Sequence, residues 1–296
     1  MEFLNFLAQY RSTFGNILFQ AITWFGEETL VIVIICWLYW CRNKKFAYTI
    51  AFTCFASGLL VQGLKITFRI PRPWVLDPQF QPVSSAVSGA TGYSFPSGHT
   101  QSGTALYSSL AFYFHKTWQK VLCILFFLAI GFSRMYLGCH TPQDVITSMG
   151  IALVCSYLFF RFFYQTSKES SHHGWISCIL AICAAALLLY TFVLYHQGIL
   201  SLDNAADCAK ASGAGLGFAL GYYLENRYVR FSPDGNRQPL RLIFGLAVTL
   251  VLQAGLKPLL GTSLLAGSVR YFLVILWIIV IYPYLFSKRT QPSAAN

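Results

Sequence analysis

The chain has 296 residues, of which 56% are hydrophobic and only 10% are charged. Soluble domains carry roughly 25% charged residues, so this composition excludes an ordinary water-soluble protein and predicts a polytopic helical membrane protein. In a soluble protein the formal net charge of +11 would suggest nucleic-acid binding. Here the Lys and Arg residues lie in short clusters between apolar segments, so we expect membrane topology and an anionic ligand, and no nucleic-acid partner.

The N-terminal segment is expected to lie on the membrane surface. Residues 3–24 mix apolar side chains with Asn5, Gln9, Arg11 and Asn16 at roughly helical spacing, which predicts an amphipathic helix in the interface. A weak first membrane span is the alternative. A basic start followed by an apolar core and a cleavage site is not visible, so no removable signal peptide is expected.

Apolar segments separated by polar or Gly/Pro-containing connections predict nine membrane spans and an all-α, polytopic transmembrane helical bundle. The spans are expected at residues 29–41, 46–66, 98–115, 121–138, 143–164, 175–195, 209–224, 241–260 and 268–286. We expect an N-terminal interfacial segment, a five-span core and a four-span C-terminal region at residues 1–27, 28–168 and 169–296.

The distribution of positive charge predicts the orientation of these spans. If the loop with Arg42, Lys44 and Lys45 is cytoplasmic, alternation of the spans places thirteen Lys and Arg residues inside and eight outside. The long loop of residues 69–95 and the turn around His140 then share the extracytoplasmic side. A single site built from both segments requires that they lie on the same side of the membrane.

The first polar cluster lies at the end of the second predicted span. Lys65 and Arg72 occupy a membrane border where a charge is costly, and Pro71 and Pro73 fix the backbone around Arg72. Taken alone, the cluster would fit ordinary snorkelling of Lys and Arg side chains to the interface.

The second cluster precedes the third predicted span directly. Ser97 and Gly98 are expected at a helix N-terminus, where free backbone N–H groups suit a phosphate oxygen. His99 follows, and its side chain can donate or accept a proton near neutral pH. A capping role would explain Ser97 but not the histidine.

The third cluster joins the exit of one predicted helix to the start of the next. Arg134 lies on the first helix, and Pro142 fits the first turn of the second. His140 and Asp144 are four residues apart, so a helical start would bring them together, with the carboxylate holding one ring nitrogen while the other attacks. Helix capping is the alternative role for Asp144.

These three clusters resemble, in order and spacing, the signature of the type 2 phosphatidic acid phosphatase family over approximately residues 28–164. That family shares its site with vanadium-dependent haloperoxidases and glucose-6-phosphatase. The resemblance implies a phosphatase that needs no metal and no cofactor, with His140 as nucleophile, His99 as acid toward the leaving oxygen and Asp144 as the orienting acid. It further implies that the phosphoryl group is bound by Lys65, Arg72, Ser97, Gly98 and Arg134.

The expected substrate is a lipid phosphomonoester such as phosphatidic acid, phosphatidylglycerol phosphate or a phosphorylated long-chain base, cleaved through a phosphohistidine intermediate. Undecaprenyl-diphosphate phosphatase is the first alternative, and a soluble phosphate ester is another. A lipid transporter or binding protein with a retained phosphate pocket is the alternative from a different class. We expect the protein to lie in a bacterial plasma membrane, and the endoplasmic reticulum membrane is the alternative. The four C-terminal spans leave room for self-association into a homo-oligomer.

Overall fold

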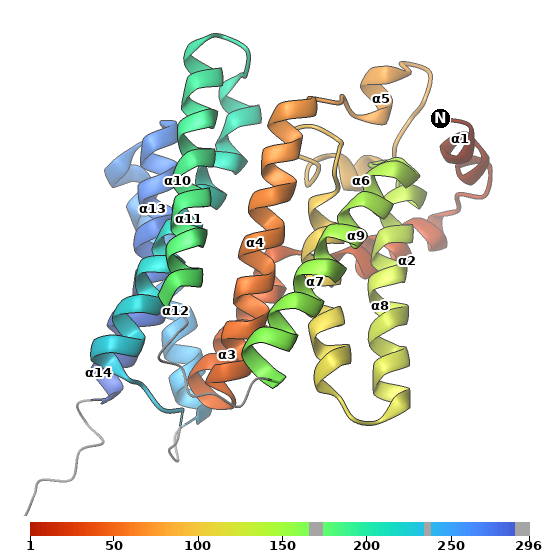
Figure 1. Ribbon diagram of the computed structural model, residues 1–296. Coiled ribbons are helices and arrows are strands. Elements are labelled where there is room, and N and C mark those ends of the chain that lie inside the picture. The colour runs from red at the N-terminus through yellow and green to blue at the C-terminus, as the bar shows by residue number, and fades with distance from the viewer. Residues whose placement is uncertain (166–173, 234–237, 288–296) are drawn as a thin grey trace, which may run out of the picture. The chain divides into compact units, whose positions relative to one another are not determined.

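The computed structural model describes residues 1–165, 174–233 and 238–287 (Figure 1). Throughout these ranges the regular structure is helical and no strand occurs, which confirms the predicted all-α class. The helices are α1 (Glu2–Gln9), α2 (Thr13–Trp24), α3 (Glu28–Cys41), α4 (Lys44–Phe68), α5 (Pro73–Leu76), α6 (Ser84–Val87), α7 (Gly98–Tyr113), α8 (Thr117–Tyr136), α9 (Pro142–Phe159), α10 (Gly174–His196), α11 (Leu202–Leu224), α12 (Gln238–Leu260), α13 (Leu264–Leu276) and α14 (Tyr282–Ser287). The π-helical segments are η1 (Phe160–Gln165), η2 (Glu225–Val229) and η3 (Trp277–Ile281).

The chain forms two compact units. The first comprises Met1–Ile34 and Tyr48–Thr166, and the second comprises Ile35–Ala47 and Ser167–Asn296. The chain therefore leaves the first unit within α3 and returns to it within α4. The predicted boundary at residues 168 and 169 lies outside the described residues, so the three predicted regions stay a prediction. The predicted inside cations Lys168, Arg237, Lys288 and Arg289 also lie outside them.

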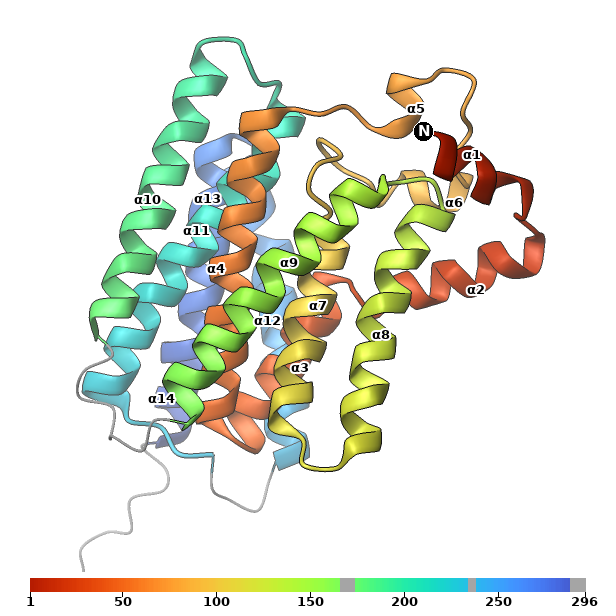
Figure 2. The same ribbon diagram turned by 45° about the vertical axis from the view of Figure 1, so that its right-hand side comes forward.

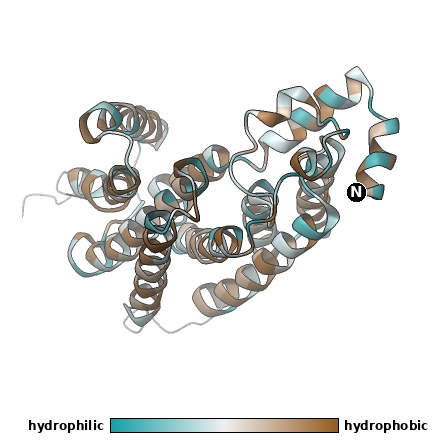
Figure 3. Cartoon of the chain, turned by 90° about the horizontal axis from the view of Figure 1, so that it is seen from above, coloured by the Kyte–Doolittle hydropathy of each residue, from teal (hydrophilic) through white to brown (hydrophobic). Residues whose placement is uncertain are grey.

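Within the described ranges, seven stretches are long and apolar enough to cross a membrane, so the chain is a multi-pass membrane protein. They are Thr13–Cys41, Lys44–Leu76, Thr117–Tyr136, Pro142–Phe163, Gly174–His196, Pro239–Leu260 and Leu264–Leu285. These stretches correspond to seven of the nine predicted spans. In Figure 3, hydrophobic residues run along most of the helices. The predicted spans at 98–115 and 209–224 are also helices, α7 and α11, but neither is among these stretches, and α7 has only 16 residues.

Burial explains why α7 and α11 are less apolar than the other long helices. α7 has 16 residues, is buried from Thr100 to Ser109, and packs against α8 and α9. α11 packs against α10 and α13 and is likewise buried along most of its length. Because neighbouring helices rather than lipid surround them, polar side chains are tolerated. Ser108 Oγ, for example, donates to the Thr104 carbonyl at 2.6 Å.

Helix α8 shows the opposite pattern on one of its faces. Trp118, Leu122, Leu125 and Leu128 follow one another at helical spacing and are all exposed. A contiguous apolar stripe of this kind would be unfavourable in water, whereas hydrocarbon covers it without cost. The exposed face of α8 is therefore a lipid-facing surface of the first unit.

The long loop after α4 folds back over the turn between α8 and α9. The backbone N–H of Val83 donates to the Leu137 carbonyl at 3.0 Å, and that of Ser97 donates to the Asp144 carbonyl at 3.2 Å. Figure 1 shows the short helices α5 and α6 of this loop at the same end of the unit as the start of α9. The loop and the His140 turn therefore lie together, as the prediction requires, and their extracytoplasmic location stays a prediction.

The N-terminal segment differs from the prediction. Instead of one interfacial helix over 3–24, there are two helices interrupted near Arg11, and α2 belongs to the first apolar stretch. α2 runs across the direction of α8 and packs against it (Figure 2). Arg11 Nε donates to the Tyr136 carbonyl at 2.9 Å, and the Ser12 N–H donates to the Tyr136 hydroxyl. The polar residues that indicated an interface are partly used to anchor this segment to α8.

The second unit depends on close packing between α11 and α13. A side chain added at Gly213 would meet the backbone of Ser268, and one at Gly217 would meet the backbone of Phe272. Ser268 Oγ donates across the interface to the Ala209 carbonyl at 2.9 Å. Small residues thus allow the two helix backbones to approach, a common way of joining helices in membranes.

We predict that Gly213→Ala destabilises the protein by about 1–3 kcal/mol, because the new methyl group has no space against α13. Gly255→Ala on α12 is the matched control, since an added Cβ there meets nothing within 4 Å. The control should be neutral or stabilising by up to about 1 kcal/mol. Thermal unfolding of both detergent-purified variants measures this, and equal midpoints would contradict the packing interpretation.

Candidate active site

Arg72 lies in the loop after α4 and is fixed by carbonyl groups on two sides. Its Nη2 donates to the Thr91 carbonyl at 2.6 Å, and its Nε donates to the Gly92 carbonyl at 3.1 Å. Its Nη1 donates to the Cys139 carbonyl at 3.1 Å and to Nε2 of His140 at 2.8 Å. The guanidinium therefore joins the long loop to the turn between α8 and α9.

Lys65 is held in a similar way. It lies in the last turn of α4, is 8% exposed, and its Nζ donates to the Tyr93 carbonyl at 3.0 Å. The consecutive loop residues 91–93 thus supply carbonyl acceptors to both cations. Carbonyl oxygens partly neutralise the buried positive charges without carrying a full negative charge of their own, so the region keeps a positive field for an anion.

His140 is buried in the turn before α9, with 1% of its surface exposed. An arginine can only donate, so Nε2 accepts from Arg72 and the neutral ring carries its proton on Nδ1. Burial lowers the pKa of His140 well below 6.5, and the positive charges of Arg72, Arg134 and Lys65 lower this pKa further. At neutral pH the ring is neutral and keeps a lone pair on Nε2.

Asp144 has the capping role as well as a position beside His140. It is the third residue of α9, where its Oδ2 accepts from the Thr141 N–H at 2.8 Å and completes a capping box. The same oxygen lies 3.4 Å from His140 Nδ1, which makes no hydrogen bond within the described part of the chain. The two side chains approach each other as expected, but α9 begins only at Pro142, so the capping box rather than a helical turn through His140 brings the carboxylate close.

Ser94 was missed as a site residue by sequence reasoning. Its hydroxyl donates to Asp144 Oδ2 at 2.6 Å, and its side chain is buried. It lies only three residues before Ser97, within the second polar cluster, but a serine before a Phe-Pro pair carries no recognisable pattern. Its contact fixes the rotamer of the carboxylate that faces His140.

Helix α7 begins at Gly98 with Ser97 as its N-cap, as predicted. Ser97 Oγ accepts from the Thr100 N–H at 3.4 Å and from the Thr100 hydroxyl at 2.9 Å. A Cβ added at Gly98 would meet nothing within 4 Å, so the first turn of α7 is open on that side. Ser97 Oγ is used for capping here, and its predicted contact with a phosphate stays a prediction.

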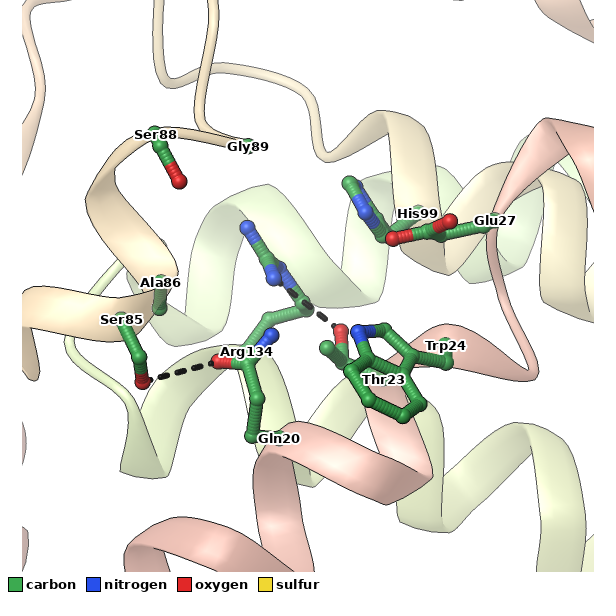
Figure 4. Close-up of a pocket in the computed structure, with 10 residues that line it drawn as sticks. All are labelled: Gln20, Thr23, Trp24, Glu27, Ser85, Ala86, Ser88, Gly89, His99 and Arg134. Atoms are coloured by element: carbon green, nitrogen blue, oxygen red, sulfur yellow. Dashed lines mark hydrogen bonds between the residues drawn. The ribbon is translucent and has the colours of Figure 1, made fainter.

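His99 and Arg134 line a cavity of about 250 Å³ (Figure 4). The cavity is bounded by α2, α6 and the residues after it, the start of α7, and α8. Its lining residues are Gln20, Thr23, Trp24, Glu27, Ser85, Ala86, Ser88, Gly89, His99 and Arg134. Lys65, Arg72 and His140 are not among these residues, although the charges of Arg134 and His99 act on the His140 ring.

Arg134 lines the cavity and lacks hydrogen-bond acceptors for part of its guanidinium group. Its side chain is 2% exposed, and its Nη1 donates to the Thr23 hydroxyl at 3.0 Å. Its Nε and Nη2 have no hydrogen-bond partner within the described residues. A buried guanidinium with two unused donors is unfavourable, and an oxyanion in the cavity would supply acceptors for both. No spacing pattern in the sequence indicated Thr23, which lies 111 residues before Arg134.

The structure therefore gathers the predicted residues into two adjoining groups. Lys65, Arg72, His140 and Asp144 are joined through the loop and the α8–α9 turn, whereas His99 and Arg134 face the cavity. Over the residues that the structure describes, no three His, Cys, Asp or Glu side chains are grouped as a metal site would require. The arrangement offers a neutral imidazole, a second histidine and three cations to an anionic ligand.

Comparison with known families matches most of the chain. The model of the PAP2 superfamily matches residues 46–168, which contain all the predicted site residues. A second model, described as the transmembrane extension of PAP2 superfamily phosphatases, matches residues 209–292. No solved structure gives a significant match.

Three curated relatives are phosphatases by name. The chain is 31% identical to the undecaprenyl-diphosphatase of Bacillus subtilis, over 45% of this chain and 66% of that protein. It is 28% identical to a probable sphingosine-1-phosphate phosphatase of Dictyostelium discoideum, over 50% of this chain and 38% of that protein. A dihydrosphingosine 1-phosphate phosphatase of Saccharomyces cerevisiae is 21% identical over 89% of this chain and 68% of its own length. The chain thus spans less than two thirds of the first two relatives.

We predict that orthophosphate or vanadate stabilises the protein against heat, because an oxyanion satisfies the unused donors of Arg134. At a concentration 100 times the dissociation constant, binding adds about 2.7 kcal/mol to the free energy of unfolding. Arg134→Met should unfold at a similar or higher temperature without ligand but lose the response to the oxyanion. Arg227→Met, at an exposed arginine of η2, is the control and should keep the full response. An unchanged response in Arg134→Met would remove Arg134 from the binding site.

Proposed function

The chain belongs to the PAP2 superfamily of membrane lipid phosphatases, and on this premise we propose that it hydrolyses a lipid phosphomonoester through a phosphohistidine intermediate on His140. The observation that carries this proposal is the contact between Arg72 Nη1 and His140 Nε2. Because the arginine can only donate, the lone pair is on Nε2, and the guanidinium proposed to bind phosphate lies directly beside it. A pure binding protein would not need a neutral, buried imidazole in that position.

In the first step of the proposed reaction, the lone pair of His140 Nε2 attacks phosphorus. The bond between phosphorus and the lipid oxygen breaks, and His99, which takes a proton from the phosphate monoester as this binds, gives that proton to the lipid oxygen, so that the lipid alcohol leaves. In the second step His99 takes a proton from water, the resulting hydroxide attacks the phosphohistidine, and the phosphorus–nitrogen bond breaks. Phosphate leaves with the proton of His99, so that His140 and His99 are both neutral again for the next cycle.

Lys65, Arg72 and Arg134 are proposed to stabilise the transferring phosphoryl group. Phosphoryl transfer depends mainly on positioning and on positive groups around the equatorial oxygens. Phosphate oxygens would replace the loop carbonyls as acceptors for Lys65 and Arg72, while the open N-terminus of α7 at Gly98 adds a backbone N–H. The three cations supply the charge that a metal provides in other phosphatases, so we propose a metal-independent reaction.

Asp144 is proposed to stabilise the charge that His140 acquires in the intermediate. Its Oδ2 is 3.4 Å from Nδ1 while the ring is neutral. Once Nε2 is bound to phosphorus the ring becomes cationic, and a stronger, shorter hydrogen bond from Nδ1 to the carboxylate is expected. The contact from Ser94 keeps the carboxylate in place for this step.

A sphingoid base phosphate is the substrate class that the comparisons favour. The yeast dihydrosphingosine 1-phosphate phosphatase aligns with 89% of this chain, and so with part of its C-terminal region too, whereas the undecaprenyl-diphosphatase aligns with 45%. Undecaprenyl diphosphate is the second candidate, supported by the 31% identity with the bacterial enzyme. The two substrates differ in phosphate number and in the presence of an amine, so they can be separated directly.

We further propose that the site opens on the extracytoplasmic or luminal side. The support is the excess of Lys and Arg on the side of the Arg42 loop, thirteen against eight by alternation of the nine predicted spans. The bacterial plasma membrane stays a prediction, and the relatives come from both bacteria and eukaryotes.

We predict that the detergent-purified protein releases phosphate in EDTA from one lipid class in a panel. The panel contains phosphatidic acid, phosphatidylglycerol phosphate, sphinganine 1-phosphate, undecaprenyl diphosphate and glucose 6-phosphate. His140→Ala should lose turnover by at least about a thousandfold, since no other group replaces the nucleophile. His115→Ala, at an exposed histidine of the same unit, is the control and should keep full activity. Full activity of His140→Ala would exclude this nucleophile, and inactivity of the wild type on every substrate would favour a binding or transport protein.

The pH dependence of kcat/KM provides a separate prediction. Protonation of His140 removes the attacking lone pair, so activity falls as pH decreases through the pKa of this residue in the free enzyme. Because burial and neighbouring cations lower this pKa, the loss should begin well below pH 6.5. Arg72→Met removes the nearest of these cations and should move the acid limb toward neutral pH, in addition to reducing kcat/KM. An acid limb at the same pH in both proteins would show that another group controls it.

A further inference from the structure

An acidic side chain lines the same cavity as the phosphate-binding Arg134. Glu27 lies in the short connection between α2 and α3, and Figure 4 shows its carboxylate directed to the cavity on the side of His99. Among the residues that the structure describes, no hydrogen bond or ion pair satisfies this carboxylate, and it is only partly exposed. The position lies outside the three polar clusters and outside the matched residues 46–168.

A carboxylate at this place works against the binding of phosphate alone. Like charges repel, and the repulsion is stronger in a partly buried cavity than in water. A cavity that binds a phosphate monoester without other charged groups would bind it more tightly with a neutral residue at position 27. The charge of Glu27 does stabilise the buried cation Arg134 in the same cavity, but it favours the binding of a phosphate ester only if the ligand brings a positive charge beside its phosphate.

We propose that Glu27 is a specificity-determining residue that binds a protonated amine next to the phosphate of the substrate. This inference rests on the proposed function and refines its substrate class to a zwitterionic lipid monophosphate, as in a sphingoid base phosphate. Arg134 and His99 would take the phosphate end, and Glu27 would take the ammonium group on the neighbouring carbon. The cavity of about 250 Å³ has the size of such a headgroup rather than of a whole lipid.

The remaining lining of the cavity suits the same headgroup. Ser85 Oγ donates to Gln20 Oε1 at 3.3 Å, and this pair faces the cavity with further hydrogen-bonding capacity for a hydroxyl group of the substrate. Trp24 is 58% exposed and offers an apolar surface to the start of a hydrocarbon chain. Polar, charged and apolar contacts are thus available within one cavity.

A purely structural role for Glu27 would be to favour the N-terminus of α3, which begins at the next residue. Acidic residues at such positions are stabilising because they interact with the helix dipole. This role predicts an effect on stability and no effect on the choice between substrates. The ratio of kcat/KM for two substrates therefore distinguishes the two roles.

The test compares sphinganine 1-phosphate with its 2-deamino analogue, which has the same chain and phosphate but no positive charge. The wild type should prefer the amine-containing lipid by about tenfold or more in kcat/KM, as expected for a partly desolvated ion pair. Glu27→Gln should reduce this preference to about twofold or less and leave hydrolysis of the deamino lipid equal or faster. Glu27→Asp should retain part of the preference, and Glu2→Gln, at an exposed acid of α1, should retain all of it.

The outcomes separate this inference from the function on which it rests. Hydrolysis of both lipids with no preference in the wild type would overturn the role of Glu27 and leave the phosphatase proposal intact, even if the Gln variant did not fold. The same conclusion would follow if Glu27→Gln kept the preference of the wild type. Failure of the wild type to hydrolyse either lipid would overturn the proposed function and this inference together.

Discussion

The contact between Arg72 and His140 organises the rest of the first unit. It places a permanent cation within 2.8 Å of a ring that must stay neutral, in a region with little water. The carbonyls of Thr91, Gly92 and Cys139 accept from the same guanidinium and stabilise this arrangement. The long loop must therefore return to the α8–α9 turn, and its length allows the carbonyls of Thr91 and Gly92 to reach the guanidinium.

A single oxygen atom connects helix formation with the organisation of the site. Asp144 Oδ2 accepts from the Thr141 N–H at the start of α9 and from the Ser94 hydroxyl in the loop, and it faces the His140 ring. The capping box that starts α9 is thus also the support of the proposed nucleophile. Local helix energetics and catalytic geometry cannot be optimised independently at this position.

The sequence predicted much of the site because each cluster has a local signature. The N-cap at Ser97 and the first-turn position of Pro142 follow from capping chemistry, and both are found as expected. Thr23, Ser94 and Glu27 could not be predicted in the same way, because their contacts depend on how distant segments fold together. Thr23 lies in α2 and Glu27 follows it, so their positions depend on how α2 packs across α8. Amphipathic spacing alone indicated only an interfacial helix.

The burial of α7 has a consequence for counting membrane crossings. A topology derived from apolar segments alone would omit this helix, since its polar side chains are covered by α8 and α9 rather than by lipid. The loop with Arg72 would then be assigned to one face of the bilayer and the turn with His140 to the other. A hydrogen bond of 2.8 Å cannot bridge a hydrocarbon layer of about 30 Å, so the contact itself requires one more crossing between the two segments. In this protein the distance between two side chains shows that the number of membrane crossings between their segments is even, which hydropathy alone does not show.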